Sequence, residues 1–260
     1  MKLHHIRQGE GEPLVLVHGL GGSIVVWRPV IDLLATERDV VAVDLPGFGR
    51  TPDPGRGFVP TAAELGEAVS ELCAGLGVER PHLAGNSLGG WVALEMAAAG
   101  RAASVCAISP AGLWREPLGP RRRERNQIGR RIRPLVDLAL RSARARGAIL
   151  RTTVARPDRL TREEAQELVG NYLDAPLYAA ANEEMRLGAF ERKDDVDVPV
   201  TLAWGELDRI VGRPSRSRRP PGARYIEMPG WGHTPTWDDP EGVAALILDA
   251  SSAPAPAPAG

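Results

Sequence analysis

The sequence is poor in cysteine and aromatic residues, and it has no long apolar run. Its 260 residues include only two cysteines, Cys73 and Cys106, too few for a disulfide framework or a cysteine-based metal site. No apolar stretch approaches the roughly 20 residues that a membrane-spanning helix needs. The opening residues, MKLHHIRQGE, lack the apolar centre of a secretory signal peptide. These absences predict a cytoplasmic protein with no metal ion, in which both cysteines are buried apolar residues.

The net charge is small, but the arginines are unevenly distributed. The formal net charge is -1, so we expect no overall attraction toward nucleic acid or an anionic membrane. Between Arg115 and Arg151, however, twelve arginines stand against three acidic residues. No aromatic residues, on which bases could stack, interleave these arginines. We therefore interpret the segment as a solvated helical face whose isoleucine and leucine side packs onto the rest of the protein. We expect no nucleic-acid and no membrane partner.

Short apolar runs alternate with helical patterns along most of the chain. The runs lie at residues 14–18, 40–44, 82–86, 104–109, 198–204 and 224–228. The helical patterns lie at residues 27–34, 62–76, 88–99 and 240–248. Continuous apolar runs separated by helices are typical of parallel strands that helices cover on both faces. The sequence therefore predicts an α/β fold with a doubly wound, mostly parallel sheet of about seven or eight strands.

Two segments interrupt this alternation. Between the runs at 104–109 and 198–204, apolar residues recur at helical spacing, although Pro134 should kink or break any single helix there. We predict a helical cap over residues 113–190, inserted between core segments 1–112 and 191–250. Residues 251–260 repeat proline and alanine and have nothing to bury, so we expect an extended, disordered tail.

The strongest chemical signal is a G-x-S-x-G motif at residues 85–89. Ser87 stands at its centre, after an apolar run and before a helical pattern. A serine on a sharp strand-to-helix turn holds its hydroxyl out above the sheet, and the flanking glycines leave room for the close chain segments. We therefore predict that Ser87 is a nucleophile. The competing interpretation is an ordinary glycine-rich turn between a strand and a helix.

A serine hydroxyl needs a base to act as a nucleophile. Among five histidines, His233 lies in a glycine-rich loop after the last apolar run, where it can reach the carboxyl ends of the strands. Asp208 follows an earlier run and precedes His233, which completes the order Ser, Asp, His. Glu206 is the local rival for the acidic position. The aspartates at 238–239 are predicted to cap the last helix.

A second glycine-rich loop, HGLGGS at residues 18–23, follows the run at 14–18. Glycines let the main chain turn sharply and direct its amides toward a reacting oxygen. We predict that the backbone N–H groups of Leu20 and Leu88 form an oxyanion hole. A phosphate-binding loop is the alternative, but the segment has neither a G-x-G-x-x-G nor a G-K-[ST] motif.

These blocks together resemble the α/β-hydrolase family, and specifically its serine members with a helical cap. In chain order they are HGLGGS (18–23), DLPGFG (44–49), GNSLGG (85–90), WGELD (204–208) and GWGH (230–233). The resemblance implies a triad of Ser87, Asp208 and His233, a small-molecule substrate, no cofactor, and a cap that follows the sixth strand of the family fold. It also implies that Asp44 braces loops at the edge of the site.

Two stretches depart from the family pattern. The N-terminus is too short to include the family's first strand, which predicts seven strands rather than eight. Residues 212–221 contain three prolines where the family has a helix, so that helix should be short or absent.

The resemblance defines the catalytic machinery better than the reaction. A serine nucleophile argues against the haloalkane dehalogenase and epoxide hydrolase branches, whose nucleophile is aspartate. We expect hydrolysis of a carboxylic ester or lactone, with a pocket formed partly by the apolar residues Trp27, Leu113 and Trp114. One alternative is hydrolysis of a carbon–carbon bond in a vinylogous diketone acid, which calls for a cation such as Arg186 beside the serine. The other is a non-catalytic ligand-binding protein. The sequence leaves the oligomeric state open.

Overall fold

Seven strands form one sheet in the computed structural model, which describes residues 1–120 and 131–252. The strands are β1 (His5–Gln8), β2 (Glu12–Val17), β3 (Arg38–Val43), β4 (His82–Asn86), β5 (Ser104–Ile108), β6 (Val200–Gly205) and β7 (Arg224–Met228). Their order across the sheet is β1-β3-β2-β4-β5-β6-β7. β1 runs antiparallel to β3, and the other neighbouring pairs are parallel. The predicted mostly parallel sheet is confirmed.

The strands lie where the apolar runs predicted them. β4 and β7 match their predicted bounds, and the ends of the other predicted strands differ from the observed ends by one or two residues. Every residue of β3, β5 and β6 is buried, so these strands face helices on both sides. That double burial explains why their sequences are continuous rather than alternating in hydrophobicity.

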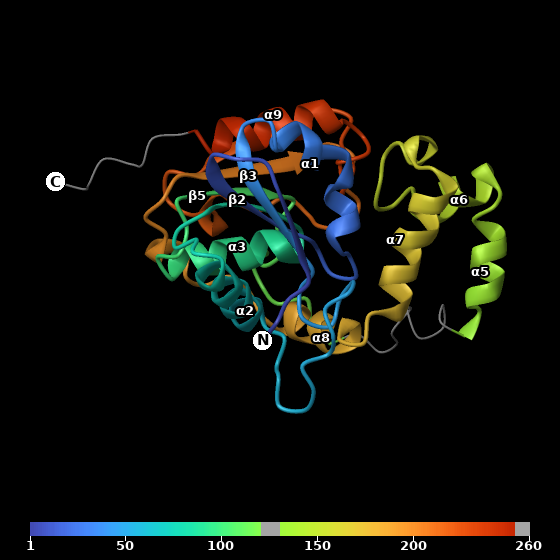
Figure 1. Ribbon diagram of the computed structural model, residues 1–260, viewed down its shortest axis with the longest axis horizontal. Helices are drawn as coiled ribbons and strands as arrows, with labels where there is room; N and C mark the ends of the chain where they lie inside the picture. Colours follow the sequence, from blue (N-terminus) through green and yellow to red (C-terminus); the bar gives the residue numbers. More distant parts are fainter. Residues whose placement is uncertain (121–130, 253–260) are drawn as a thin grey trace.

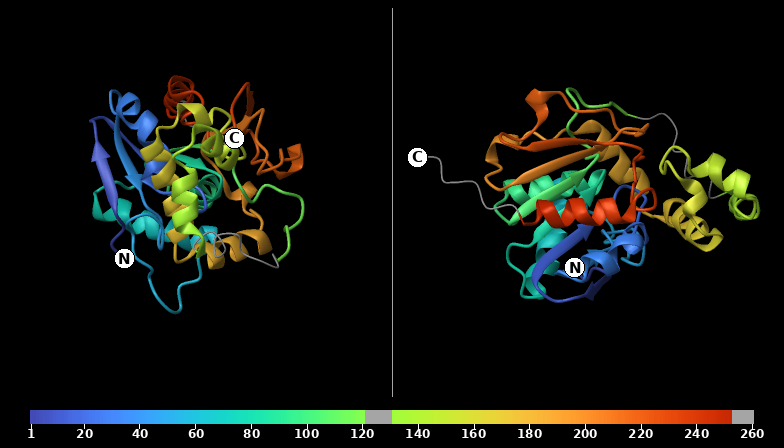
Figure 2. Two further views of the ribbon diagram at one scale, coloured as in Figure 1. Left: turned by 90° about the vertical axis from the view of Figure 1, so that its right-hand side faces the viewer. Right: turned by 90° about the horizontal axis from the view of Figure 1, so that it is seen from above.

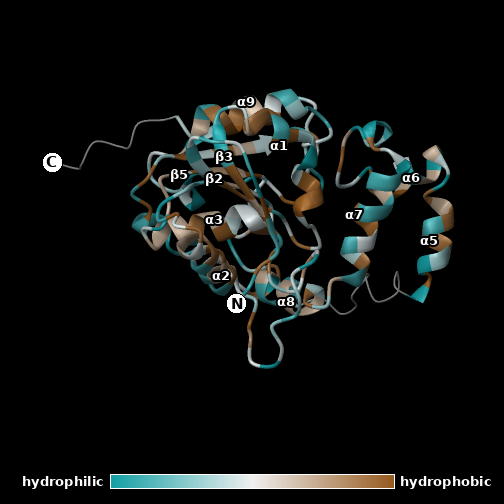
Figure 3. Ribbon diagram, viewed as in Figure 1, coloured by the Kyte–Doolittle hydropathy of each residue, from teal (hydrophilic) through white to brown (hydrophobic). Residues whose placement is uncertain are grey.

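Helices cover both faces of the sheet (Figure 1). On one face α1 (Arg28–Leu34) packs beside α9 (Pro240–Ala250), and on the other α2 (Ala62–Gly75) packs beside α3 (Leu88–Ala98). Figure 3 shows the hydrophobic residues concentrated in the strands between these two layers. The core is accordingly divided into two clusters, one on each side of the sheet.

Polar side chains define where the outer helices begin. The Thr61 hydroxyl accepts a hydrogen bond from Glu64 N at the start of α2. Asp239 accepts one from Gly242 N at the start of α9, where Pro240 occupies the first turn. Asp239 therefore caps α9 as predicted. Asp238 does not, because its carboxylate binds two backbone N–H groups outside the helix.

Within the described residues, four further α-helices lie between β5 and β6, and we call them the insert helices. They are α5 (Arg133–Ala139), α6 (Ala143–Leu150), α7 (Arg162–Asp174) and α8 (Tyr178–Leu187). α5, α6 and α7 project from one side of the core, with α5 outermost (Figures 1 and 2). α7 begins with a reciprocal capping box between Thr161 and Glu164.

The expected packing of the basic segment is wrong for α5. Most of the described arginines of the whole basic segment are exposed, as expected, but Ile132, Leu135 and Leu138 are exposed too, Leu135 to 65%. The reason is that α5 lies outside α7, where Arg133 forms an ion pair with Asp174 of α7; the buried residue at its end is Leu140, which joins the core cluster on the side of α1 and α9. The part of the basic segment at residues 121–130 lies outside the described residues.

Two other predictions concern the chain after β6. The stretch at 212–221 forms a single short 3-10 turn, Arg216–Arg218, as its prolines predicted. The prediction of an extended tail is wrong for Ser251 and Ser252, because their side chains accept hydrogen bonds from the Arg38 guanidinium. Residues 253–260 lie outside the described residues.

Asp44, directly after β3, joins three separate segments of the fold. Its carboxylate accepts hydrogen bonds from the backbone N–H groups of Ile24 and Arg50, at 2.7 and 2.8 Å, and lies 2.9 Å from His4 Nδ1. The carboxylate is buried, so these donors have no ready replacement from water. The arrangement supports the bracing position that the sequence resemblance implied.

We expect Asp44→Ala to lower the free energy of unfolding by about 2 to 5 kcal/mol, because two or three donors lose their acceptor. Urea denaturation of the two proteins measures this difference. Asp53→Ala is the matched control, since the Asp53 carboxylate accepts one hydrogen bond in an exposed turn. Equal stability of Asp44→Ala and Asp53→Ala would contradict the bracing role.

Candidate active site

Ser87 occupies a strained turn between β4 and α3. Its backbone has φ 56° and ψ −118°, a combination that side-chain-bearing residues rarely adopt. The flanking glycines are required sterically. A Cβ atom at Gly85 would lie 2.2 Å from the carbonyl oxygen of Gly89, and one at Gly89 would lie 2.1 Å from that of Val17. The turn therefore has the geometry that the G-x-S-x-G motif predicted, and Ser87 is 8% exposed.

The loops after β6 and β7 bring a histidine and a carboxylate together. His233 Nδ1 lies 2.9 Å from an Oδ atom of Asp208, and both side chains are buried. The other Asp208 oxygen accepts the backbone N–H groups of Ile210 and Val211. Glu206, the rival acid, instead accepts the N–H group of Gly230. With Nδ1 directed at Asp208, His233 keeps Nε2 for another partner, which is the orientation that a catalytic base needs.

The pKa of the Asp208 carboxyl is lower than its ordinary value, although two effects oppose each other. Burial by itself raises the pKa, and it is the largest single effect. The hydrogen bond and charge of His233, together with the hydrogen bond of Ile210 N–H, outweigh burial and lower it. Asp208 is thus held as a carboxylate, the form that stabilises an imidazolium.

Asn86 links the nucleophile turn to the histidine loop, which sequence reasoning missed. Its side-chain amide donates to the carbonyl oxygens of His233, at 2.7 Å, and of Ile108, at 3.1 Å. Its Oδ1 accepts from the Thr234 hydroxyl at 3.2 Å. Because Asn86 directly precedes Ser87, this amide places the loop of His233 against the turn of Ser87. The only sequence signal was a polar residue at the second position of the motif.

The loop at residues 18–23 lies directly against Ser87. A Cβ atom at Gly19 would lie 3.0 Å from Ser87 Cβ. His18 fixes the start of the loop, with Nδ1 2.8 Å from Gly19 O and with Nε2 accepting from Leu45 N at 3.0 Å. Burial lowers the pKa of His18, which suits a ring that must accept a hydrogen bond at Nε2. The loop is therefore placed where its amides can reach an oxygen bound to the substrate carbon.

Leu88, the other predicted donor, opens helix α3. The first N–H groups of a helix have no intrahelical acceptor, and the helix dipole favours negative charge at that end. Leu88 follows Ser87 directly, so its N–H group belongs to the nucleophile turn. The turn and the loop at 18–23 thus approach Ser87 from two different elements.

The three predicted pocket residues lie in two different places. Trp27 is fully buried in the core cluster on the side of α1 and α9. Leu113 and Trp114 belong to the other cluster, where Trp114 packs edge-on against Trp91 and donates to Gly188 O at 2.9 Å. The structure does not bring the three together, and their contact with a substrate stays a prediction.

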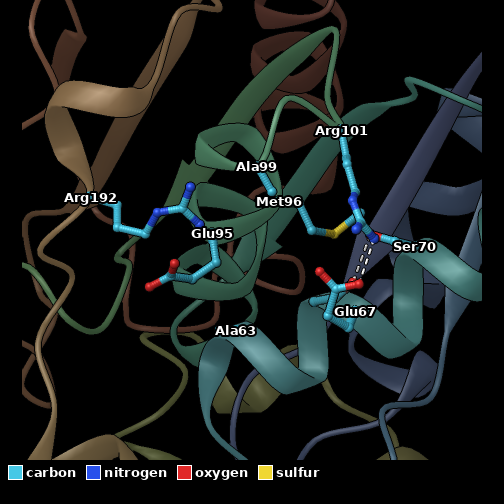
Figure 4. A pocket seen from close by; sticks show the side chains of 9 residues that line it. Ala63, Glu67, Ser70, Glu95, Met96, Ala99, Arg101 and Arg192 are labelled. Atoms are coloured by element: carbon cyan, nitrogen blue, oxygen red, sulfur yellow. Dashed lines mark hydrogen bonds and ion pairs between the residues drawn. The ribbon is translucent and has the colours of Figure 1, made fainter.

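A small surface cavity lies at the other end of α3 from Ser87 (Figure 4). It holds about 30 Å³ and is bordered by Glu95, Arg101 and Arg192, with Glu67 paired to Arg101. α3 spans eleven residues, so its two ends are about 15 Å apart. The cavity is therefore separate from the Ser87 site.

Residues 1–120 and 131–252 contain neither a metal-binding cluster nor a membrane-spanning helix. No group of three or more His, Cys, Asp or Glu side chains there could hold a metal ion. No helix in the same residues is long and apolar enough to cross a membrane. Burial raises the pKa of the Cys73 thiol to about 11 and that of Cys106 to about 12, so neither is a ready nucleophile.

A family model, curated proteins and solved structures each match most of this chain. A sequence model described as "Alpha/beta hydrolase family" matches residues 14–246. The dihydrolipoyllysine-residue acetyltransferase component of the acetoin cleaving system of Pseudomonas putida is 32% identical over 92% of this chain, which spans only 63% of that protein. An epoxide hydrolase of Mycobacterium tuberculosis is 30% identical, over 72% of this chain and 93% of that protein. The crystal structure of a bacterial membrane phospholipase A superposes with a TM-score of 0.75 at 26% identity, over 96% of this chain and 84% of that one.

The lowered pKa of Asp208 predicts a specific pH dependence of stability. A carboxyl with a depressed pKa in the folded protein contributes stability above its unfolded pKa, about 3.9, and loses it as pH falls through the folded value. We therefore expect the difference in free energy of unfolding between wild type and Asp208→Asn to be constant above about pH 5 and to shrink below about pH 4.

Urea denaturation across this pH range measures the effect. Asp53→Asn, in an exposed turn, reports how much pH dependence follows from removing any carboxylate. If the difference for Asp208→Asn grew as the pH fell, the Asp208 pKa would be raised rather than lowered.

Proposed function

This chain belongs to the alpha/beta hydrolase family, and from that premise we propose that it is a serine hydrolase that cleaves a carboxylic ester or lactone through an acyl-enzyme. Ser87 is the nucleophile, His233 the base, and Asp208 the acid that orients the base. The observation that carries the proposal is the 2.9 Å contact of His233 with Asp208, in a loop that Asn86 holds against the Ser87 turn.

The first half of the proposed reaction forms the acyl-enzyme. Ser87 Oγ attacks the acyl carbon while His233 Nε2 takes the hydroxyl proton, and the carbonyl oxygen becomes an oxyanion. The backbone N–H groups of Leu20 and Leu88 stabilise this charge. The bond from the acyl carbon to the leaving oxygen then breaks, and the imidazolium returns its proton to that oxygen, so an alcohol departs.

The second half regenerates the enzyme with water. His233 takes a proton from a water molecule, whose oxygen attacks the acyl carbon and forms a second oxyanion at the same position. The bond to Ser87 Oγ breaks, the serine recovers its proton from the imidazolium, and a carboxylic acid is released. Asp208 stays ionised throughout and stabilises the imidazolium in both halves, consistent with its lowered pKa.

The serine separates this proposal from the chemistry of the epoxide hydrolase relative. The resemblance assigns an aspartate nucleophile to that branch, because a carboxylate can open an epoxide and leave an ester that water then cleaves. A serine alkoxide would leave an ether, which water does not cleave under these conditions. Ser87 therefore favours an acyl substrate.

The contacts of Arg186 favour an ester over the carbon–carbon alternative. A diketone acid substrate calls for a cation beside the nucleophile. The Arg186 guanidinium donates to the carbonyl oxygens of Gly119 and Leu118, at 2.8 and 3.1 Å, and so serves the loop that precedes the insert helices. We accordingly place ester hydrolysis first. In this proposal the substrate is a small molecule, the reaction uses no cofactor, and the protein binds neither nucleic acid nor a membrane.

Ser87→Ala should fold normally and lose turnover of p-nitrophenyl esters by roughly 10³- to 10⁶-fold, because the triad acts as a unit. A labelled fluorophosphonate should modify the wild-type protein and leave Ser87→Ala unlabelled. Ser109 and Thr234 also carry buried hydroxyl groups. Their variants Ser109→Ala and Thr234→Ala are matched controls for labelling, and both should remain labelled. Retention of more than about a tenth of wild-type activity by Ser87→Ala would show that another group is the nucleophile.

The kcat/KM for a short-chain aryl ester or an enol-lactone should exceed that for a ring-fission diketone acid. Both reactions use the same serine and oxyanion donors, so the comparison isolates recognition of the substrate carboxylate. Parallel assays with p-nitrophenyl butyrate, a lactone and a ring-fission product measure the ratio. A higher kcat/KM for the ring-fission product, lost in Arg186→Met, would reverse the order of the two reactions.

A further inference from the structure

We propose that helix α7 is part of the oxyanion apparatus, with Asn171 and Tyr172 as positioning residues that hold the loop at residues 18–23 in place beside Ser87. The inference rests on the proposed function, since it deepens the account of the same site. It concerns a contact between the insert helices and a catalytic loop, which are far apart in sequence.

Within the described residues, hydrogen bonds from the core reach this loop at its two ends. At the beginning His18 Nε2 accepts from Leu45 N at 3.0 Å, and at the end Asp44 accepts from Ile24 N at 2.7 Å. Between these points stand Leu20, Gly21, Gly22 and Ser23. The Leu20 side chain also packs against the core cluster on the side of α2 and α3, a contact of the side chain and not of its N–H group. Within the loop one backbone hydrogen bond, from Gly22 N to Gly19 O, closes the turn. A glycine-rich segment has many accessible backbone conformations, so its own sequence does not determine where the Leu20 amide points.

Helix α7 supplies contacts to this middle part. Asn171 Nδ2 donates to Ser23 Oγ at 2.7 Å, across 148 positions of sequence. Ser23 is buried, and its Oγ also accepts from Val25 N, so the hydroxyl connects α7 to the turn that follows the loop. One polar contact therefore fixes the last residue of the loop relative to α7.

Two aromatic rings cover the glycine next to Leu20. Tyr172 and Tyr178 pack edge-to-face with their ring centres 4.8 Å apart. A Cβ atom at Gly21 would lie 2.8 Å from Tyr172 Cδ2 and 3.2 Å from Tyr178 Cδ2. Gly21 also has φ +73°, the left-handed conformation that favours glycine. The rings therefore lie against the backbone of Gly21, the residue that follows the proposed donor Leu20.

An oxyanion hole works because its donors are already directed at the oxygen before the reaction begins. If α7 provides that order, then loosening its contact should weaken binding of the transition state more than binding of the substrate. A residue that only lines the pocket or only stabilises the fold would not produce this difference. The inference thus predicts a particular kinetic signature.

The test compares Asn171→Leu, which keeps the side-chain volume and removes the donor, with wild type. With p-nitrophenyl butyrate, we expect kcat/KM to fall by about 10-fold and KM to stay the same, a part of the roughly 10²- to 10³-fold that loss of an oxyanion donor costs. The inhibition constant of phenylboronic acid, whose adduct with the serine places an oxygen in the oxyanion position, should rise by the same factor. Hydrogen exchange of the amides at 18–23 should be faster in the variant.

Glu163→Ala is the matched control, because Glu163 lies on the exposed side of the same helix. It should leave kcat/KM, the boronic acid constant and the exchange rates unchanged. A rise in KM with unaltered boronic acid binding and unaltered exchange in Asn171→Leu would overturn the inference while the proposed function stood. Failure of fluorophosphonate to label the wild-type protein would instead overturn the proposed function, and the inference with it.

Discussion

Close packing of bare main chain, between the end of β2 and the start of α3, is the constraint on which the site depends. At Gly89 there is room for no side chain, because a Cβ atom would lie 2.1 Å from the carbonyl oxygen of Val17. This contact brings the loop after β2 against the turn that carries Ser87. The backbone of Ser87 is strained in the same turn, since the chain must leave β4 and enter the helix within a single residue.

Buried polar side chains then connect loops that no strand or helix joins. Asp44 holds the end of the loop after β2, Asn86 holds the loop of His233, and Asp208 holds the imidazole itself. Each of these side chains satisfies two or more donors or acceptors, so removing one would leave several buried groups unpaired. The geometry of the candidate site is therefore a property of the hydrogen-bond network as much as of the sheet. The sheet fixes where the loops begin and end, and the hydrogen bonds fix how the loops lie relative to one another.

The sequence predicted the parts of this structure that depend on local patterns. Continuous apolar runs marked the strands, because buried parallel strands need no polar face. The glycines around Ser87 marked the turn, because a close approach excludes every other residue. What it could not predict were the contacts between distant segments. Asn86 is an ordinary polar residue until the loop of His233 lies beside it, and Asn171 is one of several polar residues on an amphipathic helix. The packing of the apolar side of α5 was predicted wrongly for the same reason. Periodicity shows which residues share one side of a helix, but it does not show which element packs against that side.

The segment between β5 and β6 contacts both the loop at residues 18–23 and the loop of His233, and this limits how the protein could be re-engineered. Asn171 binds the loop at residues 18–23, and Thr153 O accepts from Thr234 N beside His233, while Asp238 ties the N–H group of Arg156 to that of Gly232. A helical segment transplanted from a relative to change selectivity would arrive without these partners. Such a chimera would gain new helices and lose the hydrogen bonds that hold the loop at residues 18–23 and the loop of His233 in place. Successful grafts should be those that carry the anchoring positions along with the helices, so the natural unit of recombination here is larger than the insert helices alone.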